Sequence, residues 1–283
     1  GGYGQMYLPR GVAVDSNSNL WVADTWSHRV LKYDESGVLQ KTIGRKTSWP
    51  GQSGSANGQF KKPWALAIDS SDNVYVADMN NRRVQVFDKD GNYLNKFGRY
   101  GNYRKGFYFR EPHGIAIDSA DNVYVVDYQR NWVKKFKQTR ATISDPLAWK
   151  YERTWGKYGL TSGTFDRPWG ITIDGTDQVY VADRNNHWVQ VFDARGVFQL
   201  QLRGQATLSK WASDYLNVNP DEQRTREMSN LIPDLPPHLN TPHHISSQTE
   251  PYFWGPVSVR LDGHGRLFVT ESNRHRFQVY QRS

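Results

Sequence analysis

The sequence contains no cysteine among its 283 residues. This absence excludes disulfide bonds, thiol catalysis and thiolate metal sites within the chain. The sequence also lacks any apolar run near the ~18 residues that a membrane-spanning helix needs, so we expect no membrane insertion. Hydrophobic residues make up only 37% of the chain, whereas aromatic residues reach 14%. This composition is typical of many short, half-buried strands whose rings pack between sheets.

Acidic residues are outnumbered by basic ones. The formal net charge is +8 and the sequence pI is about 9.5. Such a charge favours contact with a polyanion, but a basic protein that is simply soluble has the same charge, and composition leaves both open. The chain opens with Gly1-Gly-Tyr-Gly, without an initiator methionine or a signal-like apolar segment. We therefore expect a processed protein or a piece of a longer one.

Two short sequence patterns recur along the chain. The first is a pair of apolar runs around a polar turn, and it is nearly identical in Val74–Phe87 and Val179–Phe192. It recurs with substitutions in Leu20–Tyr33, Val123–Phe136 and Leu267–Tyr280. The second pattern precedes each copy and is a proline followed by an apolar run that ends in Asp: Pro9–Asp15, Pro63–Asp69, Pro112–Asp118, Pro168–Asp174 and Pro256–Asp262. The chain is therefore organised as an internal repeat.

The spacing of the repeat indicates its architecture. Each unit holds three strands and, in most units, a fourth after a polar turn that ends in Gly. An interval of about 50 residues with several strands per unit indicates propeller blades. The last interval is longer, and within it Asn219 as a cap and Pro220 at the first position predict a helix. We expect one all-β domain, residues 1–283, of five blades with a helical or irregular insertion at residues 205–254 before the last repeat.

The fifth repeat is incomplete. The chain reaches only the third strand of this repeat, at Tyr280, and Gly1–Leu8 matches a linker between blades instead of a fourth strand. We expect a three-stranded last blade, or a fourth strand supplied by other sequence or by a partner. An unpaired strand edge favours the addition of such a strand.

These patterns resemble the NHL repeat. Its usual form runs Pro-x-Gly-(apolar)-Ala-(apolar)-Asp, then an apolar strand ending Ala-Asp, then Asn-Asn-Arg and a Val-Gln-Val-Phe strand. The resemblance covers all five units and most of the chain. It implies a β-propeller that presents a ligand or a partner on one face. It does not imply one activity, because NHL propellers include RNA binders, protein-interaction modules, sensor domains and a zinc-dependent amidating lyase.

One acidic residue closes the second strand of every repeat: Asp24, Asp78, Asp127, Asp183 and Glu271. A ring of carboxylates could hold a metal, but repetition at equivalent positions indicates a structural role. In NHL-like blades this acid caps the turn and pairs with the Arg five places on, here Arg29, Arg83 and Arg276. Trp132 and Trp188 stand in that place in the third and fourth repeats, and the pairing there stays open.

The positions of the histidines indicate structural roles instead of catalysis or metal binding. His28, His187 and His275 occupy one slot of the repeat, which indicates packing. His238, His243 and His244 cluster in the insertion, where the lack of a flanking acid favours a solvated loop over a metal site. The amidating-lyase branch needs several zinc-binding histidines at the channel mouth, and His113 alone stands at such a position. Because its counterparts are Arg10, Trp64, Trp169 and Val257, we expect no metal and no cofactor.

Antiparallel strand order assigns each loop to one end of the propeller. The linkers between repeats share one end with the turns that join second and third strands. Basic and aromatic side chains alternate in the linkers 44–62, 98–111 and 156–167, so we expect a basic aromatic face there. The opposite end carries the Asp-rich turns and should be acidic. The insertion leaves and returns at the basic end with an excess of acids, so we expect it to form an acidic helical lid.

The residue after each repeat proline should surround the mouth of the central channel. Ligand binding is therefore expected to centre on Arg10, Trp64, His113 and Trp169. The surrounding cations are expected to be Arg45, Lys46, Arg99, Arg104 and Lys105. Aromatic rings stack on sugars, bases or side chains, and the cations favour an anionic or electron-rich partner. The competing interpretation is that Trp64 and Trp169 only plug the channel.

These observations favour a non-enzymatic binding or scaffold propeller whose partner is a protein, a glycan or another anionic molecule. Two alternatives stay open: an RNA-binding NHL propeller, and a metal-dependent lyase or hydrolase of the amidating-lyase type. RNA binding predicts a steep loss of affinity with salt. The expected location is extracellular or at a bacterial cell surface.

Overall fold

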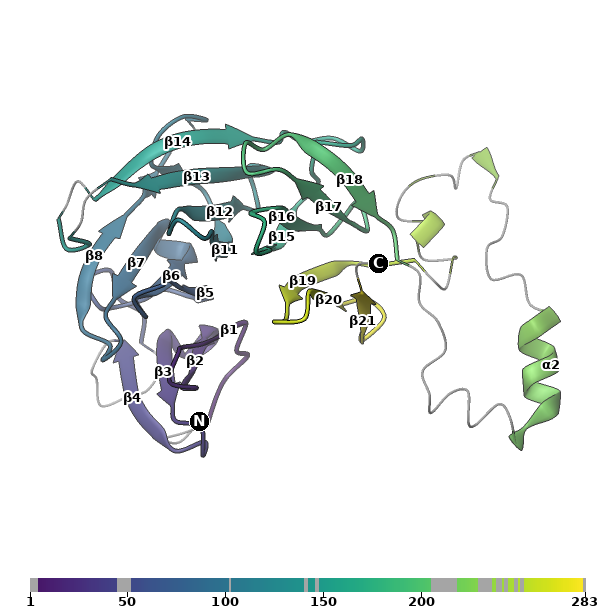
Figure 1. The fold of residues 1–283 in the computed structure, drawn as a ribbon, viewed down its shortest axis with the longest axis horizontal. Coiled ribbons are helices and arrows are strands. Elements are labelled where there is room, and N and C mark those ends of the chain that lie inside the picture. The colour runs from purple at the N-terminus through teal and green to yellow at the C-terminus, as the bar shows by residue number, and fades with distance from the viewer. Residues whose placement is uncertain are drawn as a thin grey trace.

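The structure is a computed structural model that describes residues 5–44, 52–101, 103–139, 142–145, 148–204, 218–228, 236–237, 241, 244–246, 249 and 252–281. Five antiparallel sheets follow one another in an arc around a central axis (Figure 1). Each sheet is a meander in which consecutive strands pair, and we number the sheets as blades 1 to 5. The prediction of an all-β propeller with five blades is confirmed.

The strands fall where the two patterns predict them. Blade 1 holds β1 (Gly11–Val14), β2 (Leu20–Asp24), β3 (Arg29–Tyr33) and β4 (Leu39–Gly44). Blade 2 holds β5 (Pro63–Ile68), β6 (Val74–Asp78), β7 (Arg83–Phe87) and β8 (Tyr93–Phe97). Blade 3 holds β11 (Pro112–Ile117), β12 (Val123–Asp127), β13 (Trp132–Gln138) and β14 (Trp149–Trp155). Blade 4 holds β15 (Pro168–Ile173), β16 (Val179–Asp183), β17 (Trp188–Phe192) and β18 (Phe198–Leu202). Blade 5 holds β19 (Pro256–Leu261), β20 (Arg266–Glu271) and β21 (Arg276–Gln281).

Shorter elements lie in the connections. Two-residue strands β9 (Arg99–Tyr100) and β10 (Tyr108–Phe109) pair in parallel within the linker from blade 2 to blade 3. One-turn 3-10 helices, Thr25–Ser27 and Met79–Asn81, join the second and third strands of blades 1 and 2. None of the helices in the described part of the chain is long and apolar enough to cross a membrane.

The core is distributed between neighbouring blades. Successive residues of a strand point to opposite faces, and in a propeller both faces of an inner sheet meet another sheet. The strands β6, β12 and β16 are accordingly buried at every position. Between blades 2 and 3, for example, Val84 and Phe97 pack against Phe136 and Trp149. Apolar residues on both faces thus hold successive sheets together.

The acid at the end of each second strand is buried and bonded within its own blade. One carboxylate oxygen accepts a backbone N–H two positions before the repeat proline: Tyr7 to Asp24, Lys61 to Asp78, Arg110 to Asp127, Asp166 to Asp183 and Trp254 to Glu271, at 2.7–2.8 Å. The Arg pairs of blades 1, 2 and 5 form as expected: Arg29–Asp24, Arg83–Asp78 and Arg276–Glu271. This acid is therefore structural.

Blades 3 and 4 replace the missing arginine differently. In blade 4 the indole Nε1–H of Trp188 donates to Asp183 at 2.7 Å, in the place of a guanidinium. Without a cation at this position, burial raises the pKa of Asp183 to about 7,. In blade 3 the backbone N–H groups of Glu111 and Arg130 donate to Asp127, at 3.1 and 3.3 Å. Both blades keep the turn capped.

Side chains also join each blade to the next at both ends. At the end with the Asp-rich turns, a serine donates its N–H and hydroxyl to an aspartate of the following blade: Ser16 to Asp72, Ser70 to Asp121 and Ser119 to Asp177. At the other end, a residue in the left-handed conformation accepts the N–H that precedes the next repeat proline: His28 from Lys62, Asn131 from Arg167 and His187 from Gly255. The histidine slot is therefore structural in blades 1 and 4, and His275 of blade 5 is exposed.

Blades 5 and 1 stand at the two ends of the arc (Figure 1). Val12 of β1 is 51% exposed. Its counterparts in the other blades are each 1% exposed: Leu66, Ile115, Ile171 and Val259. A hydrogen bond of 3.4 Å from Arg260 to the carbonyl of Val12 links the two blades. Blade 5 has three strands, which confirms the prediction for the incomplete repeat, and the described residues 5–8 form no strand with it.

The described part of the insertion does not form a lid. Helix α2 (Pro220–Met228) begins at the predicted proline, with Asp221 and Glu222 in its first turn. It lies beside the propeller instead of over the central strands (Figure 1), and Met228 is 81% exposed. The sequence predicts the helix but not its position, because few of its residues are apolar enough to specify a packing face.

Two glycines interrupt the serine and aspartate pairing between blades 4 and 5. Gly175 stands in the serine position and Gly265 in the aspartate position. A Cβ at Gly175 meets open space, and Gly265 has a φ of 74°, close to the 61° of Asp72 and Asp177. We expect the double variant Gly175→Ser, Gly265→Asp to raise the free energy of unfolding by about 1 kcal/mol in urea titrations, because it restores the pair.

The matched control for this variant is Ser119→Ala, which removes the hydroxyl hydrogen bond to Asp177 between blades 3 and 4 and keeps the backbone one. It should lower the free energy of unfolding by a similar amount. A double variant no more stable than the parent protein would show that these pairs do not stabilise the blade interfaces.

Candidate binding site at the channel mouth

The first residue after the repeat proline lies at a local irregularity of the sheet. In blades 2, 3 and 4 the register between first and second strand shifts directly after the proline, between Pro63 and Leu66, Pro112 and Ile115, and Pro168 and Ile171. A bulge of this kind redirects the side chains that it contains. Here those side chains are Trp64, His113 and Trp169, and all three line the central channel together with Arg10. The structure thus brings these four residues together at the channel, and their role in ligand binding stays a prediction.

The three rings form one aromatic cluster with Tyr128. His113 lies between Trp64 and Tyr128 in a near-parallel stack, with ring centroids 4.5 and 4.4 Å away. Trp169 meets the edges of this stack, with its centroid 5.0 Å from His113 and 5.5 Å from Tyr128. Offset and edge-to-face contacts of this kind are favourable beyond the area that they bury. The cluster is therefore a rigid support.

His113 is neutral in this environment. Its side chain is almost fully buried, and this burial lowers its pKa to about 3, helped by the charges of Arg10 and Arg184. The carboxylate of Glu111 lies 3.9 Å from Nε2. Because the imidazole is uncharged at neutral pH, this contact is not an ion pair. Nδ1 of His113 and Nε1 of Trp64 are buried without a hydrogen-bond partner among the described residues.

Three arginines cover the outer faces of the cluster. The guanidinium of Arg10 lies 5.3 Å from the ring centroid of Trp64, that of Arg184 lies 5.1 Å from Trp169, and that of Arg167 lies 5.2 Å from Tyr128. Arg167 also donates to the Tyr128 hydroxyl at 3.0 Å. A guanidinium stacked on a ring keeps its planar N–H groups available at its rim. Within the described residues none of the three forms a salt bridge.

The cavity inside the mouth is small, about 40 Å³. On this measure one water needs about 10–15 Å³, so the cavity has room for a few waters, and a larger ligand would contact the rim. The expectation that the tryptophan faces stack directly on a ligand is corrected by this geometry, since other rings and guanidinium groups already cover them. The groups presented outward are cationic N–H donors.

The comparisons with known proteins agree with this architecture. The sequence profile of the NHL repeat matches residues 6–33, 60–87, 109–136 and 165–192, which are the first three strands of blades 1 to 4. The chain is an NHL-repeat β-propeller. Its fifth blade keeps the same strand order and the same buried acid, although the profile does not extend to it.

Curated relatives share short stretches with this NHL propeller. It is 48% identical to protein lin-41 of Caenorhabditis elegans over 46 residues, 16% of this chain and 4% of that protein. It is 34% identical over 95 residues to the probable peptidyl-alpha-hydroxyglycine alpha-amidating lyase pgal-1 of the same organism, 33% of this chain and 26% of that one. It is 24% identical to protein brain tumor of Drosophila melanogaster over 146 residues, 52% and 13% of the two chains. The matched region is thus about a quarter or less of each relative.

Solved structures share the fold. A streptogramin B lyase superposes with a TM-score of 0.55 at 11% identity, covering 96% of this chain and 68% of that one. A chain of a nidogen/laminin complex gives the same TM-score at 15% identity, covering 96% and 75%. At these identities the similarity establishes the propeller fold alone.

The likeness to an amidating lyase raises the question of a zinc site, and the channel mouth does not fit one. Zinc sites in proteins are built from several His, Cys or carboxylate ligands. Here His113 is enclosed between two rings, and the charges of Arg10 and Arg184 oppose a cation. The described residues contain no group of three or more such ligands placed to hold a metal. His244 bonds to Thr241 at 2.8 Å, while His238 and His243 lie outside the described residues.

The predicted surrounding cations lie farther out. Arg99 stacks on Tyr108 with its guanidinium 4.5 Å from the ring centroid, and Arg104 lies 5.9 Å from Trp132. Lys105 is exposed on the same linker. Arg45 and Lys46 lie outside the described residues. The structure thus separates an inner set of arginines at the mouth from an outer set on the linker of blade 3.

Lys134 holds that outer linker in place. It stands where blades 2, 4 and 5 have Gln85, Gln190 and Gln278. Its ammonium donates to the carbonyls of Tyr103, Arg104 and Gly106 at 3.3, 2.9 and 3.1 Å. The side chain is fully buried, and burial lowers its pKa to about 8. The buried side chain of Lys134 therefore holds the linker that carries Arg99, Arg104 and Lys105 in place.

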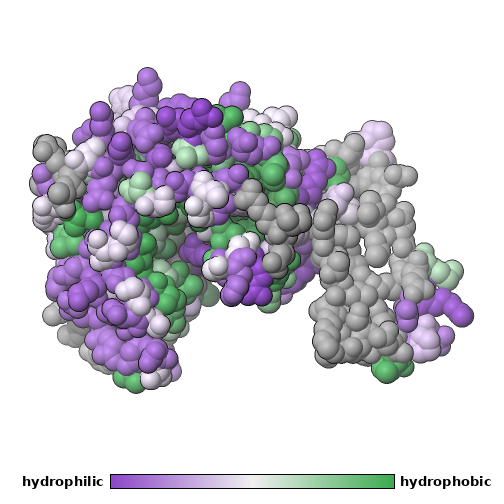
Figure 2. Space-filling model, viewed as in Figure 1, coloured by the Kyte–Doolittle hydropathy of each residue, from purple (hydrophilic) through white to green (hydrophobic). Residues whose placement is uncertain are grey.

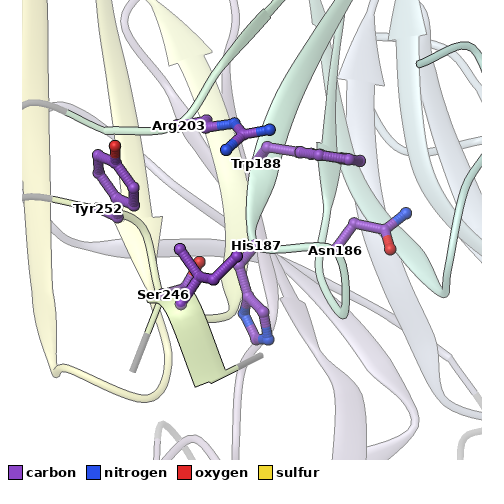
Figure 3. A pocket seen from close by; sticks show the side chains of 7 residues that line it. Asn186, His187, Trp188, Arg203, Ser246 and Tyr252 are labelled. Atoms are coloured by element: carbon purple, nitrogen blue, oxygen red, sulfur yellow. The ribbon is translucent and has the colours of Figure 1, made fainter. Parts of the chain in front are cut away.

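A second small cavity, also about 40 Å³, lies between the blade 4 turn and the base of the insertion (Figure 3). It is lined by Asn186, His187, Trp188, Arg203, Ile245, Ser246 and Tyr252. Asn186 donates to Asp183 and to the carbonyl of Gly159, and the guanidinium of Arg203 lies 5.6 Å from the Trp188 ring centroid. Because Ile245, Ser246 and Tyr252 share this lining with residues of blade 4, the end of the insertion lies against blade 4.

Sequence reasoning missed Tyr128 and Arg184, and it placed Arg167 on the basic linker 156–167 but not at the channel mouth. Tyr128 and Arg184 directly follow the buried acid of their blades, in turns that the strand order already assigns to the end with the linkers. Arg167 directly precedes a repeat proline. A search of every position next to the acid and the proline would have found all three.

The burial of His113 predicts a specific acid sensitivity. An unfolded chain protonates this residue near pH 6.5, whereas the folded protein does so near pH 3. Between these values the unfolded state binds the extra proton, so folding stability is lost as the pH falls. The variant His113→Phe keeps the ring stack and should lose about 2 kcal/mol less stability than the parent between pH 7 and pH 5.

Urea titrations of both proteins at the two pH values measure this difference. Comparison with the parent removes the contribution of other titrating groups, including that of Asp183. If parent and variant lose equal stability between the two pH values, the pKa of His113 in the folded protein is not lowered.

Proposed function

We propose that this NHL propeller is a binding or scaffold module that holds an anionic group of a protein or glycan partner at its channel mouth. The single observation that supports this proposal is the set of arginines on the aromatic cluster. Arg10 lies in blade 1, Arg167 in the linker before blade 4 and Arg184 in a turn of blade 4; each is supported by a ring, and none forms a salt bridge within the described residues.

The chemistry of these groups favours an anion. A guanidinium offers planar, paired N–H donors that match the oxygens of a carboxylate or a sulfate. The cluster behind the arginines is packed before a ligand arrives, so little side-chain freedom is lost on binding.

The outer cations suit a different role. Arg99, Arg104 and Lys105 are exposed, and exposed charges at a rim chiefly accelerate encounter and set its salt dependence. Arg184 of the inner set is half-buried against Trp169, where a charge interaction is less screened by water, whereas Arg10 and Arg167 are exposed,. Inner and outer charges should therefore be separable in kinetics.

Variants of the two sets test the proposal. In the inner pair Arg10→Gln, Arg184→Gln, we expect the affinity for a sulfated glycan such as heparin and for an acidic peptide to fall at least tenfold, through faster dissociation. In the outer set Arg99→Glu, Arg104→Glu, Lys105→Glu, we expect slower association and a shallower salt dependence. Surface plasmon resonance at two salt concentrations distinguishes these effects.

The same measurements on single-stranded RNA test the alternative. An RNA-binding propeller would prefer RNA to both other probes and would lose affinity steeply with salt, because each phosphate contact releases counterions. Equal binding by the inner variant and the parent would exclude the channel mouth as the site. The melting temperature of each variant provides the folding control.

A further inference from the structure

The linker from blade 2 to blade 3, residues 98–111, crosses blade 3 from its outer edge to the channel mouth. At the outer edge, the carbonyl of Arg104 accepts the hydroxyl of Thr154, which lies on the outermost strand β14, at 2.8 Å. At the inner end, a carboxylate oxygen of Glu111 lies 3.9 Å from Nε2 of His113. We call this segment the blade 3 linker. It connects the outer cations with the site at the mouth.

Positive charges follow the blade 3 linker along its course. Its one acid, Glu111, is half-buried. Two rings between the cations are exposed, Tyr100 at 57% and Tyr103 at 68%, and the guanidinium of Arg82 from blade 2 lies 4.4 Å from the Tyr100 ring centroid. The four cations of the linker are exposed and form no salt bridge within the described residues: Arg99, Arg104, Lys105 and Arg110.

Arg99 is fixed on the linker before any ligand arrives. Its guanidinium stacks on Tyr108 and donates to the Tyr108 hydroxyl at 2.8 Å. Its backbone N–H donates to the carbonyl of Phe107 at 2.9 Å, beside the parallel pair of β9 and β10. Because these contacts already order the side chain, Arg99 loses little conformational freedom when it binds an anion.

Lys134 departs from its counterparts in the way it contacts the linker. In blade 2, Nε2 of Gln85 donates to the carbonyl of Gln59 at 2.8 Å, and its Oε1 accepts the N–H of Gly58 at 3.0 Å. Gln190 makes the same two kinds of bond to the linker of blade 4. An ammonium has N–H donors and no acceptor. A lysine therefore requires a linker that turns only carbonyls toward it.

The blade 3 linker meets this requirement. The carbonyls of Tyr103, Arg104 and Gly106 all accept from the ammonium of Lys134. With its carbonyls turned toward the blade, the segment leaves the side chains of residues 103–105 exposed. A different course of the backbone would break at least one of the three bonds. The lysine thus determines how the cations of this segment are presented.

Lys134 also places a positive charge beneath the linker. With a pKa of about 8, it is still mostly charged at pH 7. The charge of Asp127, at the end of β12, favours the ammonium, whereas that of Arg104 opposes it. Burial of a charge costs free energy, and a neutral glutamine serves the same position in blades 2 and 4, so the fold does not require a lysine. Its charge raises the positive potential under Arg104 and Lys105.

We propose that the partner is a sulfated glycan chain, which lies along the blade 3 linker with one of its anionic groups at the channel mouth, and that Lys134 is the positioning residue that shapes the linker for it. This inference rests on the proposed function and names the class of partner. Sulfates along the chain meet Arg99, Arg104 and Lys105, and sugar rings contact the exposed faces of Tyr100 and Tyr103.

The surface suits a charged chain better than a folded protein. Protein interfaces depend on aromatic or apolar anchors that fill pockets. The two cavities described above at this end of the propeller are each about 40 Å³, too small for such an anchor. Hydrophilic residues predominate on the outer rim of the blades (Figure 2). An exposed path of cations and rings fits a partner that carries a charge on every unit of an extended chain.

Chain length provides the first test. Heparin fragments of two, four and eight sugars are compared by surface plasmon resonance on the whole protein at two salt concentrations. We expect the association rate to rise at least tenfold from the shortest to the longest fragment, with a steeper salt dependence, because only a long chain reaches the outer cations from the mouth.

The variant Lys134→Met tests the positioning role. Methionine keeps an unbranched side chain and removes all three donors. We expect the gain in association rate with chain length to fall at least threefold, while the dissociation rate of the shortest fragment stays unchanged. Hydrogen exchange of the blade 3 linker should become at least tenfold faster without any ligand. The melting temperature provides the folding control.

Lys157→Gln is the matched control for charge. Lys157 is exposed on the neighbouring linker, at the same end of the propeller, so its replacement removes one positive charge without changing the blade 3 linker. The gain with chain length should stay as in the parent. Tyr103→Ala, at an exposed ring, should weaken binding of the longest fragment at least threefold and leave that of the shortest unchanged.

The outcomes separate this inference from the function on which it rests. A parent protein that binds neither heparin nor an acidic peptide overturns the proposed function and this inference with it. Equal association rates for all fragments, or tighter binding of an acidic peptide or single-stranded RNA of equal charge, overturn the glycan chain alone. An unchanged chain-length effect or unchanged hydrogen exchange in Lys134→Met overturns the role of Lys134.

Discussion

The buried carboxylate at the end of each second strand is the interaction on which the rest of this propeller depends. It accepts the backbone N–H two positions before the repeat proline in all five blades, at 2.7–2.8 Å. A buried charge without a partner would be strongly destabilising, so the linker must return to the same point in each blade. The residue after the proline is thereby placed at the channel mouth. The geometry of the candidate site is a consequence of this constraint.

The repeat also explains which parts of the fold could be predicted from the sequence. The prolines, the apolar runs and the acids occur five times at matching spacing, so strand order, the incomplete fifth blade and the gathering of Trp64, His113 and Trp169 all follow from position. The position of helix α2 does not follow, because the insertion occurs once and has no repeated counterpart to compare with.

The character of the site was less predictable than its location. Residue type alone suggests that Trp64 and Trp169 offer free faces to a ligand. In the structure Trp64 is covered by His113 and Arg10, which come from other blades, and Trp169 is covered by Arg184 of its own blade. Contacts between blades depend on the depth at which each side chain leaves its strand, and the bulge after the proline changes that depth. Linear spacing does not contain this information.

Departures from the repeat are informative because the fold itself does not require them. At the end with the linkers they gather in blades 3 and 4, where Lys134 replaces a glutamine and Trp188 replaces an arginine. At the opposite end they gather between blades 4 and 5, where Gly175 and Gly265 depart together. Blade 1 departs too, with Leu31 in the glutamine position, so a departure is informative only where the structure shows what it contacts, as it does for Lys134.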